Sequence, residues 1–275
     1  MLPFILRLGA ILTALSHSTA APGLVIDSKL PLIRVEAFDY AFRAPATARS
    51  GFTRVRIVNR GQSPHHLVFT KVPDTASVAM IQKIVAGQLV NVVVKDWGGP
   101  NITMPGDSSE AIVQLQPGRY GLSCWINATD GKPHVMKGML SLIDVKRTSR
   151  GSVEPYADLV LHAKDFSLAF HTEPTTGHHL VRFENTGPQE HDVQIVRLRP
   201  GETVEAIRKW AAAGLVGAPP VGQLVGGAVG IDRGNRVWFP LDLRPGRYAM
   251  FCFVPDAKDE KPHILHGMVR EFTVR

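Results

Sequence analysis

Hydrophobic and polar residues alternate over short stretches along the whole chain, which is the period-two pattern of half-buried β-strands. The clearest stretches are 54–58 and 181–184, and an Asn-x-Gly turn follows each of them. Further strands are predicted at 66–72, 140–145, 192–198 and 269–274. Short strands that are separated by Gly and Pro turns predict an all-β sandwich or barrel.

Two segments depart from this alternation. Residues 76–86 and 204–213 have apolar residues three and four positions apart, and each segment follows residues that favour a helix N-terminus. The pattern therefore predicts one short helix inserted in each half of the chain.

The two halves repeat the same motifs in the same order. Pro117-Gly118-Arg119-Tyr120 recurs as Pro245-Gly246-Arg247-Tyr248, Lys132-Pro133-His134 as Lys261-Pro262-His263, and Asp39-Tyr40 is matched by Asp165-Phe166. The offset stays between 126 residues (65 to 191) and 129 residues (132 to 261). A chain of 275 residues is long enough for two small β domains. We therefore predict domains at 21–148 and 149–275.

The N-terminus has the composition of an export signal. Arg7 precedes an apolar run at 8–15, and the small residues Ser18-Thr19-Ala20 follow it. This pattern predicts a signal peptide over 1–20 and a mature protein that is periplasmic or secreted; a retained N-terminal anchor is the alternative. The run is shorter than the roughly 20 residues of a membrane span, and no other segment approaches that length. No transmembrane span is therefore predicted in the mature chain.

Positive charge is in excess but is not concentrated. The chain has 31 Lys and Arg against 24 Asp and Glu, a formal net charge of +7, with no basic block. This distribution argues against a nucleic-acid partner and favours a partner with an acidic surface.

Each half contains one early histidine and a late cluster of Cys, His and Met. The two sets are His65, Cys124, His134 and Met139, and His191, Cys252, His263 and Met268. Two imidazoles, one thiolate and a weak axial thioether suit a copper ion that changes between its two oxidation states. The spacing predicts that each late cluster lies in one loop at the end of a sandwich. We therefore expect up to two copper ions per chain.

These motifs resemble those of the cupredoxins, the blue type 1 copper family of plastocyanin and azurin. His134 to Met139 and His263 to Met268 both read H-x-x-x-G-M, and the long gap between Cys and His is most similar to that of copper nitrite reductases. The resemblance implies two tandem Greek-key β-sandwiches with type 1-like copper sites. It also implies electron transfer with a redox protein partner.

Other readings of the same residues remain open. The two cysteines of an exported protein could form one disulfide, or the sandwiches could serve as a metal-free or copper-storing interaction module. A divergent multicopper reductase or oxidase with an interdomain copper site is a further alternative. Against it, Ser123 and Trp125 flank the first cysteine and Phe251 and Phe253 flank the second, so the histidine that joins a catalytic copper to a type 1 site is absent. No catalytic residue is therefore predicted.

The remaining histidines carry weaker signals. Alternation along the strand places His66 on the opposite side from His65, which favours a solvated or edge position. His171, His178 and His179 lie close enough in sequence to form a further metal site. His266 takes the position of Lys137 in the second ligand loop, where it either lines the site or is exposed. The oligomeric state has no signal in the sequence.

Overall fold

The computed structural model describes residues 29–149, 151–216 and 220–275. The predicted signal peptide at 1–20 lies outside these residues. No helix in the described part of the chain is long and apolar enough to cross a membrane.

Strands account for most of the regular structure. The first half contains β1 (Leu32–Phe38), β2 (Ala41–Arg43), β3 (Thr47–Arg49), β4 (Gly51–Asn59), β5 (Val68–Val72), β6 (Lys95–Pro100), β7 (Ser108–Leu115), β8 (Gly118–Ser123) and β9 (Leu140–Lys146). The second half contains β10 (Leu159–Lys164), β11 (Ser167–Phe170), β12 (Gly177–Asn185), β13 (His191–Leu198), β14 (Gln223–Ile231), β15 (Arg236–Leu243), β16 (Gly246–Phe251) and β17 (Val269–Val274). The predicted all-β fold is confirmed.

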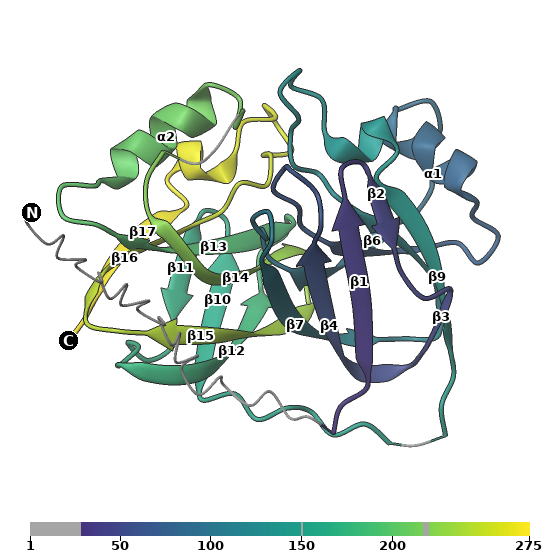
Figure 1. Cartoon of the computed structure of the whole chain (residues 1–275), viewed down its shortest axis with the longest axis horizontal. Coiled ribbons are helices and arrows are strands. Elements are labelled where there is room, and N and C mark those ends of the chain that lie inside the picture. The colour runs from purple at the N-terminus through teal and green to yellow at the C-terminus, as the bar shows by residue number, and fades with distance from the viewer. Residues whose placement is uncertain (1–28, 150, 217–219) are drawn as a thin grey trace, which may run out of the picture.

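Each half forms a β-sandwich, because it contributes strands to both of the sheets. One sheet has eight strands in the order β11-β10-β12-β15-β7-β4-β1-β2, and the other has nine in the order β17-β16-β13-β14-β6-β5-β8-β9-β3 (Figure 1). In each half the first strand pairs in parallel with the long strand that precedes the early histidine, β1 with β4 and β10 with β12. Buried aliphatic and aromatic side chains fill the space between the sheets.

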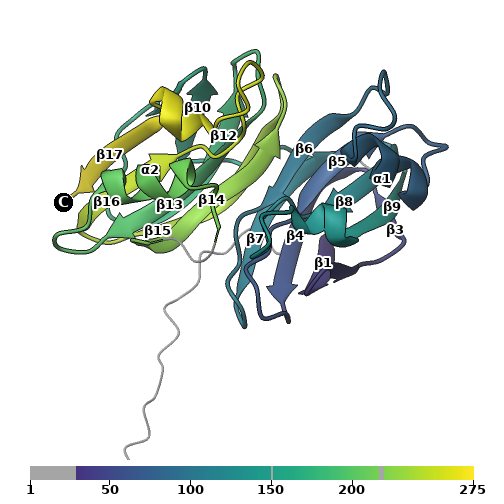
Figure 2. The ribbon, with the colours of Figure 1, turned by 90° about the horizontal axis from the view of Figure 1, so that it is seen from above.

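The two sandwiches are joined strand to strand. Strand β6 pairs antiparallel with β14, and β7 pairs antiparallel with β15, so both sheets run through the whole molecule (Figure 2). The two halves leave little room for side chains here: a Cβ atom at Gly98 would lie 2.3 Å from Val237 Cγ2, and one at Gly227 would lie 2.5 Å from Asn101 Nδ2. Glycine is therefore needed at both positions.

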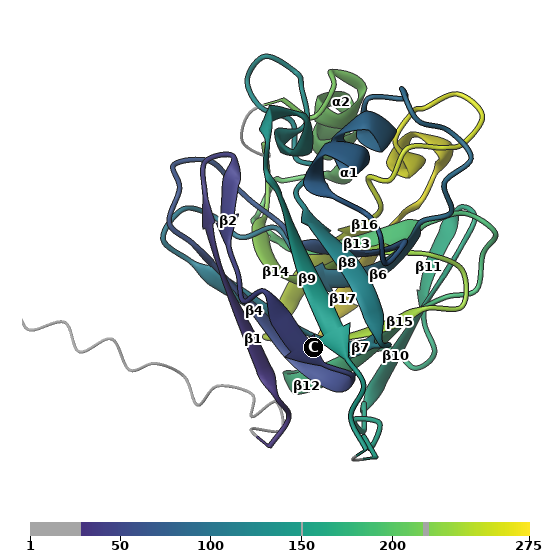
Figure 3. The same cartoon turned by 90° about the vertical axis from the view of Figure 1, so that its right-hand side faces the viewer.

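The predicted helices are present with adjusted ends. Helix α1 spans Val78–Val85 rather than 76–86, because the side chain of Ser77 accepts the backbone N–H of Met80 and caps the first turn. Helix α2 spans Val204–Ala212, close to the predicted 204–213. Both helices lie at the same end of the molecule, beside the two ligand-bearing loops (Figure 3).

Candidate metal centres

The four candidate ligands of the first sandwich lie at its helical end. His65 pairs with Thr103 in an isolated bridge, so β5 begins at Val68 instead of at the predicted residue 66. Cys124 follows β8, His134 begins a short 3-10 helix (His134–Lys137), and Met139 precedes β9. The chain can turn between the last two ligands because Gly138 adopts a φ of 104°.

Backbone hydrogen bonds hold both ligand loops in the same form. In the first loop the Val135 N–H donates to the Cys124 carbonyl at 2.7 Å, and the Met139 N–H donates to the His134 carbonyl at 3.0 Å. In the second loop, the Ile264 N–H donates to the Cys252 carbonyl at 2.9 Å, and the Met268 N–H donates to the His263 carbonyl at 3.0 Å. The position of each cysteine is therefore tied to the histidine region of the same loop.

The Cys and His donor atoms converge in each sandwich. In the first, the Cys124 Sγ lies 4.0 Å from His65 Nδ1 and 3.6 Å from His134 Nδ1, and the two nitrogens are 3.2 Å apart. In the second, Cys252 Sγ lies 3.9 Å from His191 Nδ1 and 3.5 Å from His263 Nδ1, with the nitrogens again 3.2 Å apart. A trigonal site with bonds of about 2.0 Å to nitrogen and 2.3 Å to sulfur separates its donors by about 3.5 to 3.7 Å. Both groups therefore fit a copper ion.

Burial keeps these side chains in their neutral forms when no metal is bound. All eight predicted ligands are at most 1% exposed, and Met139 and Met268 belong to the same buried core cluster as the cysteines. Burial raises the pKa of Cys124 to about 12 and lowers the pKa of His134 and His263 to about 4. The histidines are therefore neutral at neutral pH, and each thiol releases its proton when a metal binds.

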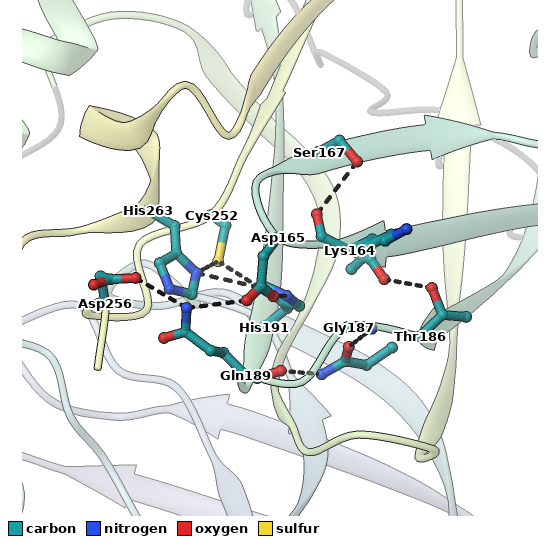
Figure 4. Close-up of polar contacts among 12 residues, drawn as sticks. Lys164, Asp165, Ser167, Thr186, Gly187, Gln189, His191, Cys252, Asp256 and His263 are labelled. Atoms are coloured by element: carbon teal, nitrogen blue, oxygen red, sulfur yellow. Dashed lines mark hydrogen bonds and ion pairs between the residues drawn. The ribbon is translucent and has the colours of Figure 1, made fainter. Parts of the chain in front are cut away.

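A carboxylate orients the early histidine of each group. Asp39 Oδ1 lies 3.2 Å from His65 Nε2, and Asp165 Oδ1 lies 2.7 Å from His191 Nε2 (Figure 4). This contact leaves Nδ1 free to face the cysteine, and it would make the imidazole a stronger electron-pair donor to a metal ion. The sequence repeats the aspartate in both halves, and this repetition was the available signal for a role that sequence reasoning did not assign.

The Asn-x-Gly motif makes room for this carboxylate. Asn59 accepts the Gly61 N–H at 2.8 Å and donates to the Thr103 carbonyl at 2.9 Å, and Asn185 makes the matching bonds in the second half. A Cβ atom at Gly61 would lie 2.5 Å from Asp39 Oδ1. At Gly187 a Cβ atom would lie 2.7 Å from the corresponding oxygen of Asp165.

The two aspartates have different hydrogen-bond partners. Gln189 Nε2 donates to Asp165 at 3.0 Å and to Asp256 at 2.9 Å (Figure 4). In the first sandwich the backbone N–H groups of Gln62 and Ser63 donate to Asp39 at 3.0 and 3.1 Å. His266 stacks on Phe166 at 5.0 Å. His266 also belongs to a third metal-capable group with Asp256 and Asp259, in which its Nε2 lies 3.1 Å from Asp259.

The expectation that His66 is solvated or at an edge is wrong. Its side chain is half-buried, and its Nε2 accepts the Trp125 N–H at 2.7 Å. Asp192 occupies the same place in the second sandwich and accepts the Phe253 N–H at 2.8 Å. Both side chains therefore support the residue that follows the cysteine.

The structure does not bring His171, His178 and His179 together as a metal group. His179 lies 2.5 Å from Asp158, His178 lies 3.4 Å from Asp242, and His171 packs against the His162 ring. The disulfide reading is also wrong, because Cys124 and Cys252 are free and belong to different groups.

Two β-sandwiches with a buried His-Cys-His group at one end of each define a tandem cupredoxin-like protein. No protein-family model matches the sequence, and no curated protein matches it.

Similar solved structures include copper proteins of several kinds. A dithionite-reduced auracyanin from Roseiflexus castenholzii is 21% identical, with a TM-score of 0.30, over 42% of this chain and 94% of that one. A blue copper oxidase from Nitrosomonas europaea is 14% identical, with a TM-score of 0.27, over 90% and 86%. A copper nitrite reductase from the same organism is 15% identical, with a TM-score of 0.25, over 90% and 93%.

Proposed function

We propose that this chain is an exported copper protein that binds up to two ions, one in each sandwich, and transfers electrons to or from a protein partner. Cys124 and Cys252 supply the thiolates, and Met139 and Met268 the weak axial ligands. The equatorial imidazoles come from His65, His134, His191 and His263. The observation that carries the proposal is the twofold occurrence of one thiol and two imidazole nitrogens that converge in a buried place. Copper held by such a set gains and loses one electron with little change in its surroundings.

Electron transfer is preferred to catalysis because neither cysteine has a neighbouring histidine in the sequence. The positive net charge of +7 supports a partner with an acidic surface. The N-terminal segment supports export to the periplasm or the outside of the cell, where signal cleavage would leave domains at 21–148 and 149–275.

The test is an absorption spectrum of the purified chain after Cu(II) addition, together with its copper content. We expect an intense band near about 600 nm, or a pair that includes about 450 nm, from thiolate-to-copper charge transfer. Cys124→Ser and Cys252→Ser should each remove about one of the two ions and its share of the band. Absence of both the band and bound copper would contradict the proposal.

A methionine pair in the first loop provides a matched control. Met139→Leu should shift the spectrum of the first site, because it replaces the proposed axial ligand. Met136→Leu should leave the spectrum unchanged, because Met136 is 53% exposed on the same loop. Equal spectra for the two variants would remove Met139 from the ligand set.

A further inference from the structure

A pocket of about 670 Å³ lies between the two sandwiches; none of the eight predicted metal ligands lines it, although several of their chain neighbours do. Its walls come from both halves: α1, β5 and the loop after Cys124 on one side, and β13, α2 and the loop after Cys252 on the other. Trp125, Trp210 and Phe253 contribute aromatic surface, and Ile84 and Val85 contribute aliphatic surface. The size is within the range of pockets that bind small molecules.

Three carboxyl groups contribute to the polar lining of this pocket. Asp96, Glu190 and Asp192 line it, and among the described lining residues there is no Lys or Arg. The carboxyls of Asp96 and Glu190 share a hydrogen bond, and Thr70 donates to Asp96 at 2.5 Å. Burial raises the pKa of Asp96 to about 7, as expected for a carboxyl without a cationic partner.

An unpaired acceptor independently indicates a ligand. Gln194 lines the pocket and is 1% exposed, and its Nε2 donates to Asp192 Oδ2 at 3.1 Å. This bond fixes the orientation of the amide, so that its Oε1 is the free group. Within the described chain Gln194 Oε1 has no hydrogen-bond partner. A buried acceptor without a donor costs free energy that a donor on a bound molecule would restore.

The sandwich fold does not require these polar groups. Counted from the matching histidines His65 and His191, the first half has Pro64 in the place of Glu190 and Val68 in the place of Gln194. Counted from the matching Gly-Gly pairs at 98–99 and 226–227, Leu224 takes the place of Asp96 in the second half. Apolar residues therefore serve at the positions equivalent to Glu190, Gln194 and Asp96, and the fold does not require a polar group at these three.

The arrangement of acceptors suits an organic cation better than a bare metal ion. No three of the side chains His66, Asp96, Glu190 and Asp192 form a described group whose donor atoms all lie within 4.8 Å of one another. Acceptors that are spread along an aromatic wall match a molecule with an ammonium group and an apolar body. We propose that this pocket binds a small apolar ammonium compound, with its charge toward Asp96 and Glu190 and its body against Trp125 and Trp210.

Binding of 2-phenylethylammonium to the purified chain tests this proposal. Trp125 and Trp210 lie in the pocket, so their fluorescence reports occupancy, and calorimetry gives the stoichiometry. We expect one saturable site per chain and at least tenfold weaker binding of 2-phenylethanol, which has the same body without the charge.

Two variants and one control locate the site. Asp96→Asn should weaken binding of the amine at least tenfold, whereas Glu205→Gln, which removes one charge from the exposed face of α2, should change it less than twofold. If Asp96→Asn does not fold, Ile84→Trp tests the site by filling the pocket and should abolish binding.

Three results would overturn the proposal: no binding of the amine, equal binding of the alcohol, or stoichiometric displacement of the amine by micromolar Ca²⁺. The measurement is made with and without copper, so its outcome is independent of that of the proposed electron transfer.

Discussion

At the scale of single residues, the metal groups depend on contacts around the ligands as well as on the ligands themselves. Asp39 and Asp165 each meet the outer nitrogen of the early histidine, and a glycine leaves the space that they occupy. The contact at Asp165 is shorter, and the side chain of Gln189 supports Asp165, whereas the backbone N–H groups of Gln62 and Ser63 support Asp39. Each early histidine is therefore held by a carboxylate that is itself fixed by further hydrogen bonds.

Replacing these carboxylates tests their role. Asp39→Asn and Asp165→Asn should each lower the Cu(II) affinity of the adjacent site by about 10- to 100-fold, since an amide is a weaker acceptor for the histidine N–H. Asp158→Asn is the matched control, because Asp158 pairs with His179 outside both groups. Competition with a chromophoric chelator measures the affinities, and unchanged values for the first two variants would show that the contact is only structural.

At the scale of elements, the two helices occupy equivalent positions in their sandwiches but have different N-terminal caps. Ser77 caps α1 through its side chain, whereas Thr203 precedes α2 without such a hydrogen bond. Because each helix lies beside the 3-10 helix of a ligand loop, its first turn contributes to the stability of the end that holds the metal group.

The caps therefore differ in their contribution to the free energy of unfolding. Ser77→Ala should reduce it by about 1 kcal/mol, because the Met80 N–H loses its acceptor. Thr203→Ala should reduce it much less. Urea denaturation of both variants measures the difference, and equal losses would mean that the Ser77 bond does not stabilise the helix in solution.

At the scale of the whole molecule, the two sandwiches behave as one body. The strand pairs β6–β14 and β7–β15 continue both sheets across the joint. Two further hydrogen bonds cross it: the Asp96 N–H donates to the Asp232 carboxylate at 2.7 Å, and the Asn101 side chain donates to the Gly226 carbonyl at 2.7 Å. Unfolding either half would expose the paired strand edge of the other.

We accordingly expect a single thermal unfolding transition in calorimetry. Ile57→Ala in the first half and Leu161→Ala in the second both remove fully buried side chains, at a cost of about 2 to 5 kcal/mol each. Each variant should lower the temperature of that one transition. Two transitions, of which each variant moves only one, would show that the halves unfold independently.

The sequence by itself determined the all-β class, six of the strands, the two helices and the two His-Cys-His sets that converge in the structure. Alternation and helix spacing are local properties, because they express which side of a strand or helix meets the core. The repeated His, Cys, His and Met set was recognisable because few residue types bind copper and because the same set occurs twice at a nearly constant offset. The sequence placed the start of α1 two residues early, because several residues before it favour a helix N-terminus and only the structure shows that Ser77 is the cap.

Only the tertiary structure decided how the halves meet. Gly98 and Gly227 carried no signal of the joint in the sequence, yet a Cβ atom at either position would meet a side chain of the other half, Val237 and Asn101 respectively. The same joint brings Asp96 of one half against Glu190 of the other. Pairing between strands far apart in the chain depends on complementary surfaces, which no local pattern of residues encodes.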